Sequence, residues 1–266
     1  MKEVAIRAAS GAVYVALVLG AAWLGAWASW ALFLLVAVLA AREWHDLYWR
    51  SGEARLTSGV SMALTAVAYC LGPSLLALTD SWTAVPWLAG SWSVAVIAIA
   101  LRESNRPKAL VFALSLVAYL ALPFLCAPWM VQRSPSLLIG FMLMLWANDT
   151  GAYLVGRAIG RKKLMPSVSP GKTWEGLIGG MLATLLAAWV VARWVDQDVD
   201  ATVWLISAPF VTAASTIGDL FESFMKRKSG VKDSGAIMPG HGGVLDRFDG
   251  YLLAAPVMAL LVRLLA

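Results

Sequence analysis

The sequence predicts an all-α, polytopic transmembrane helical bundle with about nine spans and a cytoplasmic N-terminus. Three observations support this fold class. The 266 residues are 60% hydrophobic and only 14% charged, with a mean hydropathy of +0.73, whereas soluble domains are close to half apolar and a quarter charged. The apolar residues form separate long runs, and the basic residues lie mostly on one side of these runs. Lipid must therefore solvate much of the surface.

Nine runs approach the roughly 20 mostly apolar residues that a membrane-spanning helix needs. They are residues 8–23, 28–41, 58–78, 86–101, 109–122, 137–155, 177–192, 203–218 and 251–262. Each is expected to be helical, because unpaired backbone groups cannot face lipid, and no strand alternation is evident. The first run follows Lys2 and Arg7, as in a signal peptide. Uncharged sequence continues to Ala41, however, so we expect a retained helical hairpin with a turn near residues 23–27.

Basic residues set the expected orientation. With the N-terminus in the cytoplasm, 18 of the 21 Lys and Arg residues face the cytoplasm, and only Arg133, Arg193 and Arg263 do not. The net charge of +5 then needs no nucleic acid, because basic loops face anionic headgroups. We therefore expect no nucleic-acid partner and an active site that faces the cytoplasm. Cys70 and Cys126 lie in apolar runs and match neither a disulfide framework nor a metal-site spacing.

The chain is expected to form one integrated membrane domain with two functional halves. Residues 1–107 carry little polar chemistry inside their spans and are predicted to be a transmembrane scaffold, whereas residues 108–266 are predicted to be the catalytic half. The second span is followed by one polar cluster, made of Arg42, Glu43, His45 and Asp46. We interpret His45 as an interfacial histidine rather than a ligand.

Asp149 is the only charged residue between Arg133 and Arg157, and it lies within a predicted span. A carboxylate in that position is costly and generally faces a partner or a water-filled cavity. Helical spacing puts Trp146 and Tyr153 on the same face as Asp149. A functional carboxylate is therefore predicted, and the alternative is a carboxylate neutralised by Arg157 for packing alone.

The loop at residues 167–176 combines hydroxyls with a lysine. Its Gly-Lys-Thr triplet, residues 171–173, resembles the end of a P-loop, but the glycine required five residues earlier is Pro166. No buried strand precedes the triplet either, so a P-loop fold is rejected. A helix N-terminus near residues 169–173 still offers free amides to a phosphate, and Glu175 is suited to cap it. The alternative is a capping box beside a solvated lysine.

The longest polar stretch spans residues 219–249. Four polar residues recur at helical spacing where the eighth predicted span leaves the membrane, namely Asp219, Glu222, Ser223 and Lys226. Asp246 and Asp249 share a face where the ninth span begins. The Pro-Gly-His-Gly-Gly run at residues 239–243 allows a tight backbone that approaches a ligand closely. The two helix ends then bring together carboxylate oxygens, which Mg²⁺ prefers alongside substrate phosphates. The alternative is a solvated loop with snorkelling basic residues.

This stretch resembles the signature of the phosphatidate cytidylyltransferases, also called CDP-diacylglycerol synthases. The matching positions are Ser223, Lys226, Arg227, Lys232, Asp233, Pro239, His241, Gly242, Gly243, Asp246, Arg247 and Asp249. Met238 departs from the Leu, Ile or Phe expected there but stays apolar. The runs at residues 148–153 and 167–176 also look like this family. The resemblance therefore covers the C-terminal half, and the N-terminal half matches only in hydropathy.

The resemblance implies transfer of CMP from CTP to phosphatidic acid, giving CDP-diacylglycerol and pyrophosphate, in a bacterial plasma (inner) membrane. It also implies a dependence on Mg²⁺ or Mn²⁺, compatible with a second cation, and a homodimer. Asp219, Asp246 and Asp249 are predicted to be metal ligands, and with Ser223 and Lys226 they form the predicted catalytic set. The predicted substrate-binding residues are Lys172, Arg227, Lys232, His241, Arg247, Ser167, Ser169, Thr173 and Asp149.

Two other classes of protein stay open from the sequence. One is a related CTP-using enzyme, such as a CDP-archaeol synthase or a polyprenol kinase, although the unbroken signature favours the diacyl lipid enzyme. The other is a transporter or channel, which would need charges near the bilayer midplane or broken helices in paired repeats. Here the charges cluster at one face and no repeat is visible. The Asp-Gly-x-x-Ala-Arg motif of CDP-alcohol phosphotransferases is absent from the sequence.

Overall fold

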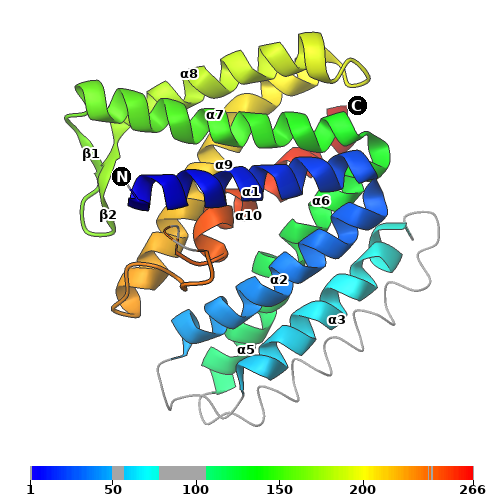
Figure 1. The fold of residues 1–266 in the computed structure, drawn as a ribbon, viewed down its shortest axis with the longest axis vertical. Helices are drawn as coiled ribbons and strands as arrows, with labels where there is room; N and C mark the ends of the chain where they lie inside the picture. Colours follow the sequence, from blue (N-terminus) through cyan, green and yellow to red (C-terminus); the bar gives the residue numbers. More distant parts are fainter. Residues whose placement is uncertain (1, 50–56, 78–105, 239, 241, 266) are drawn as a thin grey trace.

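The computed structural model describes residues 2–49, 57–77, 106–238, 240 and 242–265, which form a helical bundle with one small hairpin (Figure 1). The α-helices are α1 (Lys2–Leu24), α2 (Ala26–Tyr48), α3 (Ser58–Ala77), α5 (Arg106–Ser115), α6 (Leu122–Arg133), α7 (Pro135–Ile159), α8 (Trp174–Val190), α9 (Ala201–Lys228) and α10 (Leu245–Leu265). Two π-helical segments, η2 (Leu116–Ala121) and η3 (Val191–Val195), join α5 to α6 and extend α8. The hairpin consists of β1 (Lys163–Met165) and β2 (Ser169–Thr173).

Helices occupy eight of the nine predicted spans. Six helices among the described residues are long and apolar enough to cross a membrane, and two shorter apolar helices, Ala9–Leu24 and Ser58–Leu71, coincide with the first and third predicted spans. The predicted span at residues 86–101 lies outside the described residues. The total of nine spans and the cytoplasmic N-terminus therefore stay predictions. The predicted turn between the first two spans is confirmed, because α1 ends at Leu24 and α2 begins at Ala26.

The all-α prediction is wrong for residues 163–173. Lys163 pairs with Thr173 and Met165 with Ser169 in an antiparallel hairpin that follows the end of α7. The next helix, α8, begins at Trp174, and the side chain of Thr173 caps it by accepting a hydrogen bond from the Gly176 amide at 3.1 Å. The helix is therefore capped by the last residue of the predicted range, residues 169–173, because the residues before Thr173 pair as a strand.

An aromatic cluster joins the N-terminal half of the bundle to α10. Phe33 of α2 and Phe124 of α6 both stack on Tyr251 of α10, with ring centroids 5.8 and 5.7 Å apart. Phe248, one turn earlier in α10, meets Phe33 edge-on at 6.0 Å. Aromatic pairs at these separations are favourable beyond the area that they bury. The cluster holds the first turns of α10, which carry Asp246 and Asp249, against α2 and α6.

Helices α7 and α8 lie side by side and pack closely through glycines (Figure 1). A Cβ atom at Gly179 of α8 would lie 2.4 Å from Cβ of Val155, and one at Gly151 of α7 would lie 2.5 Å from Cβ of Ala183. Neither position has room for a side chain. The close contact holds the polar face of α7 beside the loop that precedes α8.

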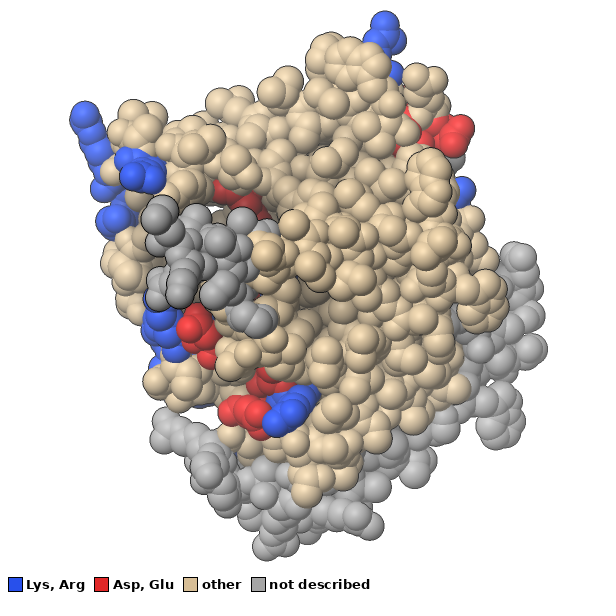
Figure 2. All heavy atoms as spheres, viewed as in Figure 1, with Lys and Arg blue, Asp and Glu red and all other residues tan. Residues whose placement is uncertain are grey.

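The charged side chains gather mainly at one end of the bundle. Figure 2 shows them over the hairpin and the α9–α10 loop, with a smaller group at the opposite end and a mostly uncharged surface between. The N-terminus lies at the hairpin end and the C-terminus at the other end (Figure 1). This distribution agrees with an apolar belt between two polar faces.

Candidate active site

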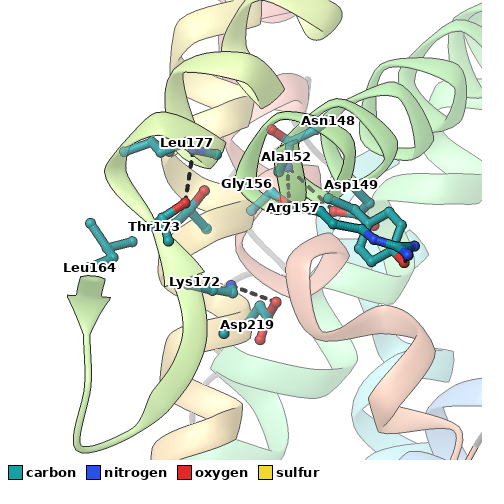
Figure 3. A pocket seen from close by; sticks show the side chains of 15 residues that line it. Asn148, Asp149, Ala152, Gly156, Arg157, Leu164, Lys172, Thr173, Leu177 and Asp219 are labelled. Carbon is teal, nitrogen blue, oxygen red and sulfur yellow. Dashed lines mark hydrogen bonds and ion pairs between the residues drawn. The ribbon is translucent and has the colours of Figure 1, made fainter. Parts of the chain in front are cut away.

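A cavity of about 430 Å³ opens between α7, the hairpin, α8 and α9 (Figure 3). Its walls combine backbone from the glycine-packed helices with polar and charged side chains. The lining residues are Asn148, Asp149, Ala152, Tyr153, Gly156, Arg157, Leu164, Gly171, Lys172, Thr173, Gly176, Leu177, Ser215, Thr216 and Asp219. Each of the three polar stretches contributes to the wall: Asp149 from the first, Lys172 from the second and Asp219 from the third. One ligand in the cavity could therefore contact all three.

An ion pair joins two of these stretches inside the cavity. Lys172 and Asp219 point toward one another from β2 and α9 (Figure 3), and Lys172 Nζ lies 2.5 Å from Asp219 Oδ2. The two side chains are 25% and 34% exposed, so a ligand in the cavity can reach both. The Ser223 hydroxyl, one turn along α9, donates to Asp219 Oδ1 at 3.2 Å. The predicted helical face of α9 is thus confirmed at these residues.

Asp149 lies between this cavity and a smaller one. It is exposed on the wall of the large cavity, and the amide of Asn148 lies 3.4 Å from its Oδ1. It also lines a second cavity of about 20 Å³ together with Trp146, Arg247 and Asp249. The prediction that Asp149 faces a cavity is therefore confirmed. A functional role for this carboxylate stays a prediction.

The carboxylate of Asp246 is held by protein donors on both oxygens. Lys226 Nζ lies 2.6 Å from Oδ1, and the amides of Gly243 and Ser234 donate to Oδ2 at 2.7 and 2.9 Å. Lys226 also lies 3.1 Å from Oε1 of the fully buried Glu222. Asp246 is not among the described residues that line the two cavities. Its contacts instead join the end of α9 to the start of α10.

The described carboxylate oxygens around the two cavities suit a divalent cation, although they do not lie together in one cluster. Among the residues that the structure describes, no three Asp, Glu, His or Cys side chains form a ready ligand group. Asp219 lines the large cavity and Asp249 the small one, and the two cavities share Asp149 and Ser215. Mg²⁺ typically uses only one or two protein carboxylates and completes its shell with water and substrate phosphates. The donor chemistry therefore fits, and the ligand set Asp219, Asp246 and Asp249 stays a prediction.

Several predicted substrate-binding residues lie away from the cavity walls. Ser167 is exposed in the hairpin turn and Ser169 is half-buried at the start of β2. Three exposed basic residues lie in or next to the α9–α10 loop, namely Arg227, Lys232 and Arg247. Of these, Arg247 borders the small cavity.

Thr173 does line the large cavity, but its hydroxyl oxygen caps α8. His241 lies outside the described residues.

Sequence reasoning missed a basic residue on the cavity wall. Arg157 lines the large cavity, and its Nη1 donates to the hydroxyl of Tyr153, which also lines it, at 2.9 Å. The signal was present in the sequence, because Asp149, Tyr153 and Arg157 recur every four residues along one helical face. Ser215 of α9, which lines both cavities, carried no such signal.

Comparison with known proteins agrees with the signature. The sequence model of the cytidylyltransferase family matches residues 5–265. A phosphatidate cytidylyltransferase of Haemophilus influenzae is 47% identical over 124 residues, which cover 45% of this chain and 43% of the relative. Its counterpart in Staphylococcus haemolyticus is 40% identical over 153 residues, covering 57% and 58%. The chain thus spans about half the length of these two relatives.

A further relative is matched over a longer stretch. The phosphatidate cytidylyltransferase of Staphylococcus epidermidis is 37% identical over 187 residues, which cover 68% of this chain and 71% of the relative. The family match reaches from the first residues of α1 to the end of α10, so it includes the N-terminal half that the signature does not cover. The chain therefore belongs to the cytidylyltransferase family, as the resemblance of its signature predicted.

Proposed function

We propose that the chain transfers CMP from CTP to phosphatidic acid, giving CDP-diacylglycerol and pyrophosphate. The observation that carries this proposal is the Lys172–Asp219 ion pair, which brings a phosphate-binding cation and a candidate cation ligand together in one cavity. The names of the relatives and the signature in α9, α10 and their loop support the same reaction.

The proposed chemistry asks mainly for positioning and charge neutralisation. A phosphate oxygen of phosphatidic acid attacks the α-phosphorus of CTP. The bond from this phosphorus to the bridging oxygen of the β-phosphate breaks, and pyrophosphate leaves with that oxygen. Lys172 and Arg157, both on the cavity wall, neutralise phosphate charge. Lys172 exchanges part of its contact with Asp219 for a phosphate oxygen when CTP binds.

When bound, Mg²⁺ or Mn²⁺ would supply further neutralisation of phosphate charge. Asp219, Asp246 and Asp249 are the proposed ligands, and a second cation is compatible with this acidic site. Ser223 orients Asp219 through its hydrogen bond. Asp246 becomes available when Lys226, which now contacts its Oδ1, moves toward a phosphate.

The proposed reaction takes place at the cytoplasmic face of a bacterial plasma membrane. The relatives come from bacteria, and six helices long and apolar enough to cross a membrane support the membrane location. The acyl chains of phosphatidic acid would stay in the bilayer while its phosphate enters the cavity. A homodimer is part of the proposal, and light scattering from detergent-solubilised protein measures it.

Product formation by the purified chain tests the proposed function. With labelled CTP, phosphatidic acid and Mg²⁺, we expect labelled CDP-diacylglycerol and an equal amount of pyrophosphate. EDTA should reduce the product to background, and added Mg²⁺ should restore it. Transfer of the γ-phosphate of CTP to polyprenol with release of CDP, or transfer of CMP to an archaeal ether-lipid phosphate in preference to phosphatidic acid, would instead favour one of the rival CTP-using enzymes. No nucleotide-dependent product with any of these lipids would contradict the proposal.

A further inference from the structure

A buried carboxylate from the N-terminal half reaches the start of α10. Glu43 lies near the C-terminal end of α2 and is 3% exposed. Its Oε1 accepts a hydrogen bond from the Val244 amide, and its Oε2 accepts one from the Leu245 amide, both at 2.9 Å. The contact joins residues 201 and 202 positions apart in the sequence.

Glu43 acts as an N-terminal cap that is supplied by another helix. The first four amides of a helix have no partner within that helix, and α10 begins at Leu245. A side-chain oxygen of a neighbouring residue commonly accepts from such amides. Here a carboxylate from α2 accepts from the amide of the first helical residue and from that of the residue before it, and its negative charge is favourable at the positive end of the helix dipole. The orientation of α10 is therefore tied to α2.

The loop before α10 closes around this carboxylate. A Cβ atom at Gly235 would lie 2.5 Å from Oε1 of Glu43, and one at Gly243 would lie 2.3 Å from Oε2. Both positions therefore require glycine while Glu43 is inserted. At position 243 two side chains approach the backbone, because a Cβ there would also lie 2.2 Å from Oγ of Ser234.

Ser234 connects Glu43 to Asp246. The Ser234 hydroxyl lies 2.9 Å from Oε2 of Glu43 and 3.0 Å from Oδ2 of Asp246. A hydroxyl has one hydrogen, so it donates to one of these carboxylates at a time. Asp246 in turn contacts Lys226 of α9. The result is one connected network from α2 through the loop to α10 and α9.

We propose that Glu43 is a positioning residue for nucleotidyl transfer. It holds the α9–α10 loop and the first turn of α10, so that Asp246 keeps its contact with Lys226 and Arg247 keeps its place beside the small cavity. Glu43 is not among the described residues that line either cavity, so it acts through these neighbours. This inference rests on the proposed function, and it gives a specific task to a helix of the half that was predicted to be only scaffold.

Glu43→Gln is the informative variant because it keeps the size of the side chain. The glutamine side chain has only one oxygen that can accept a hydrogen bond. Its NH₂ group would replace the other oxygen, so the hydrogen bond from a backbone amide or from Ser234 would be lost. Asp46→Asn is the matched control, because Asp46 is exposed three residues later in α2. For Glu43→Gln we expect kcat to fall at least about tenfold, since small misplacements of reacting groups are costly. KM for phosphatidic acid should stay within about twofold, because the bilayer part of the lipid site is untouched.

Hydrogen exchange separates positioning from a general loss of structure. In Glu43→Gln, the amides of residues 243–247 should exchange faster, while those of α7 and α8 keep wild-type protection. A double-mutant cycle with Ser234→Ala should show non-additive effects on kcat, because the two side chains share one network. Asp46→Asn should match the wild type in every measurement.

Three results would overturn the role of Glu43. They are wild-type kcat in Glu43→Gln, unchanged exchange at residues 243–247, and a loss of protection that extends through α7 and α8. Failure of the proposed function looks different, because the wild-type chain itself would then form no CDP-diacylglycerol.

Discussion

Lys226 lies between two carboxylates near the end of α9. Its ammonium group is 2.6 Å from Oδ1 of Asp246 and 3.1 Å from Oε1 of Glu222. The Glu222 side chain is fully buried, and that of Lys226 is 12% exposed. A buried charge that loses its partner is strongly destabilising. Lys226 is therefore expected to support the fold as well as the proposed reaction.

Replacing Lys226 with Met removes the positive charge and keeps most of the side-chain volume. We expect the free energy of unfolding to fall by roughly 3 kcal/mol, because two carboxylates are left without their cation. Thermal unfolding of the detergent-solubilised protein measures this change. Lys228→Met, at an exposed position in the same helical turn, is the control. Equal unfolding temperatures for the two variants would contradict the proposed pairing.

Individual residues differ in how far the sequence could predict their contacts. Asp149 stood out because a charge within an apolar run demands a partner or a cavity. The pairing of Lys172 with Asp219 was not predicted, although both were assigned to the same site. The role of Glu43 could not be predicted at all. Its partners lie some 200 positions away, and only the packing of α2 against α10 brings them together.

At the scale of elements, the glycine contact between α7 and α8 joins two helices that both contribute residues to the cavity wall. The wall of α7 carries Asp149, while α8 follows directly on the strand that carries Lys172. A side chain inserted between the two helices would separate these walls. The interface is thus a place where a small change in volume should affect both stability and activity.

Gly179→Ala tests this dependence. Its Cβ would lie 2.4 Å from Val155, and overpacking of this kind typically costs about 1–3 kcal/mol. We expect a lower unfolding temperature together with slower CDP-diacylglycerol formation. Gly20→Ala in α1 is the matched control, because a Cβ there has no atom within 4 Å among those described. Similar behaviour of the two variants would show that the close helix contact is not required.

Hydropathy predicted the long elements well and the short ones poorly. Every described span coincides with an apolar run, because lipid leaves a helix as the available structure for such a run. The hairpin was missed because the sequence of β2, Ser-Pro-Gly-Lys-Thr, has no alternation of apolar and polar residues and is typical of a loop. Its pairing with β1 depends on the chain reversal after α7. The π-helical segments η2 and η3 leave no signature in hydropathy either.

For the whole molecule, the uneven distribution of charge supports a single orientation. The hairpin, the α9–α10 loop and the N-terminus lie at one end, and the C-terminus lies at the other (Figure 1). The positive-inside rule then predicts that the hairpin end faces the cytoplasm. The loop between η3 and α9, at the opposite end, should face outward.

Cysteine labelling measures this orientation. After replacement of Cys70 and Cys126 with Ala, single cysteines are introduced as Lys163→Cys in β1 or Gln197→Cys in the opposite loop, both at exposed positions. We expect a membrane-impermeant maleimide to label Gln197→Cys in intact spheroplasts and Lys163→Cys only after permeabilisation. The reverse pattern would contradict a cytoplasmic active site.

The most direct test of the central claim is CDP-diacylglycerol formation by Asp219→Asn. The amide keeps the size of the side chain but removes the charge that pairs with Lys172 and that the proposed cation needs. We expect turnover to fall by at least about 100-fold, as when a well-placed electrostatic group is lost from an active site. Asp198→Asn, exposed in the opposite loop, should retain wild-type turnover. Near-normal turnover of a folded Asp219→Asn protein would contradict the assignment of this cavity as the reaction site.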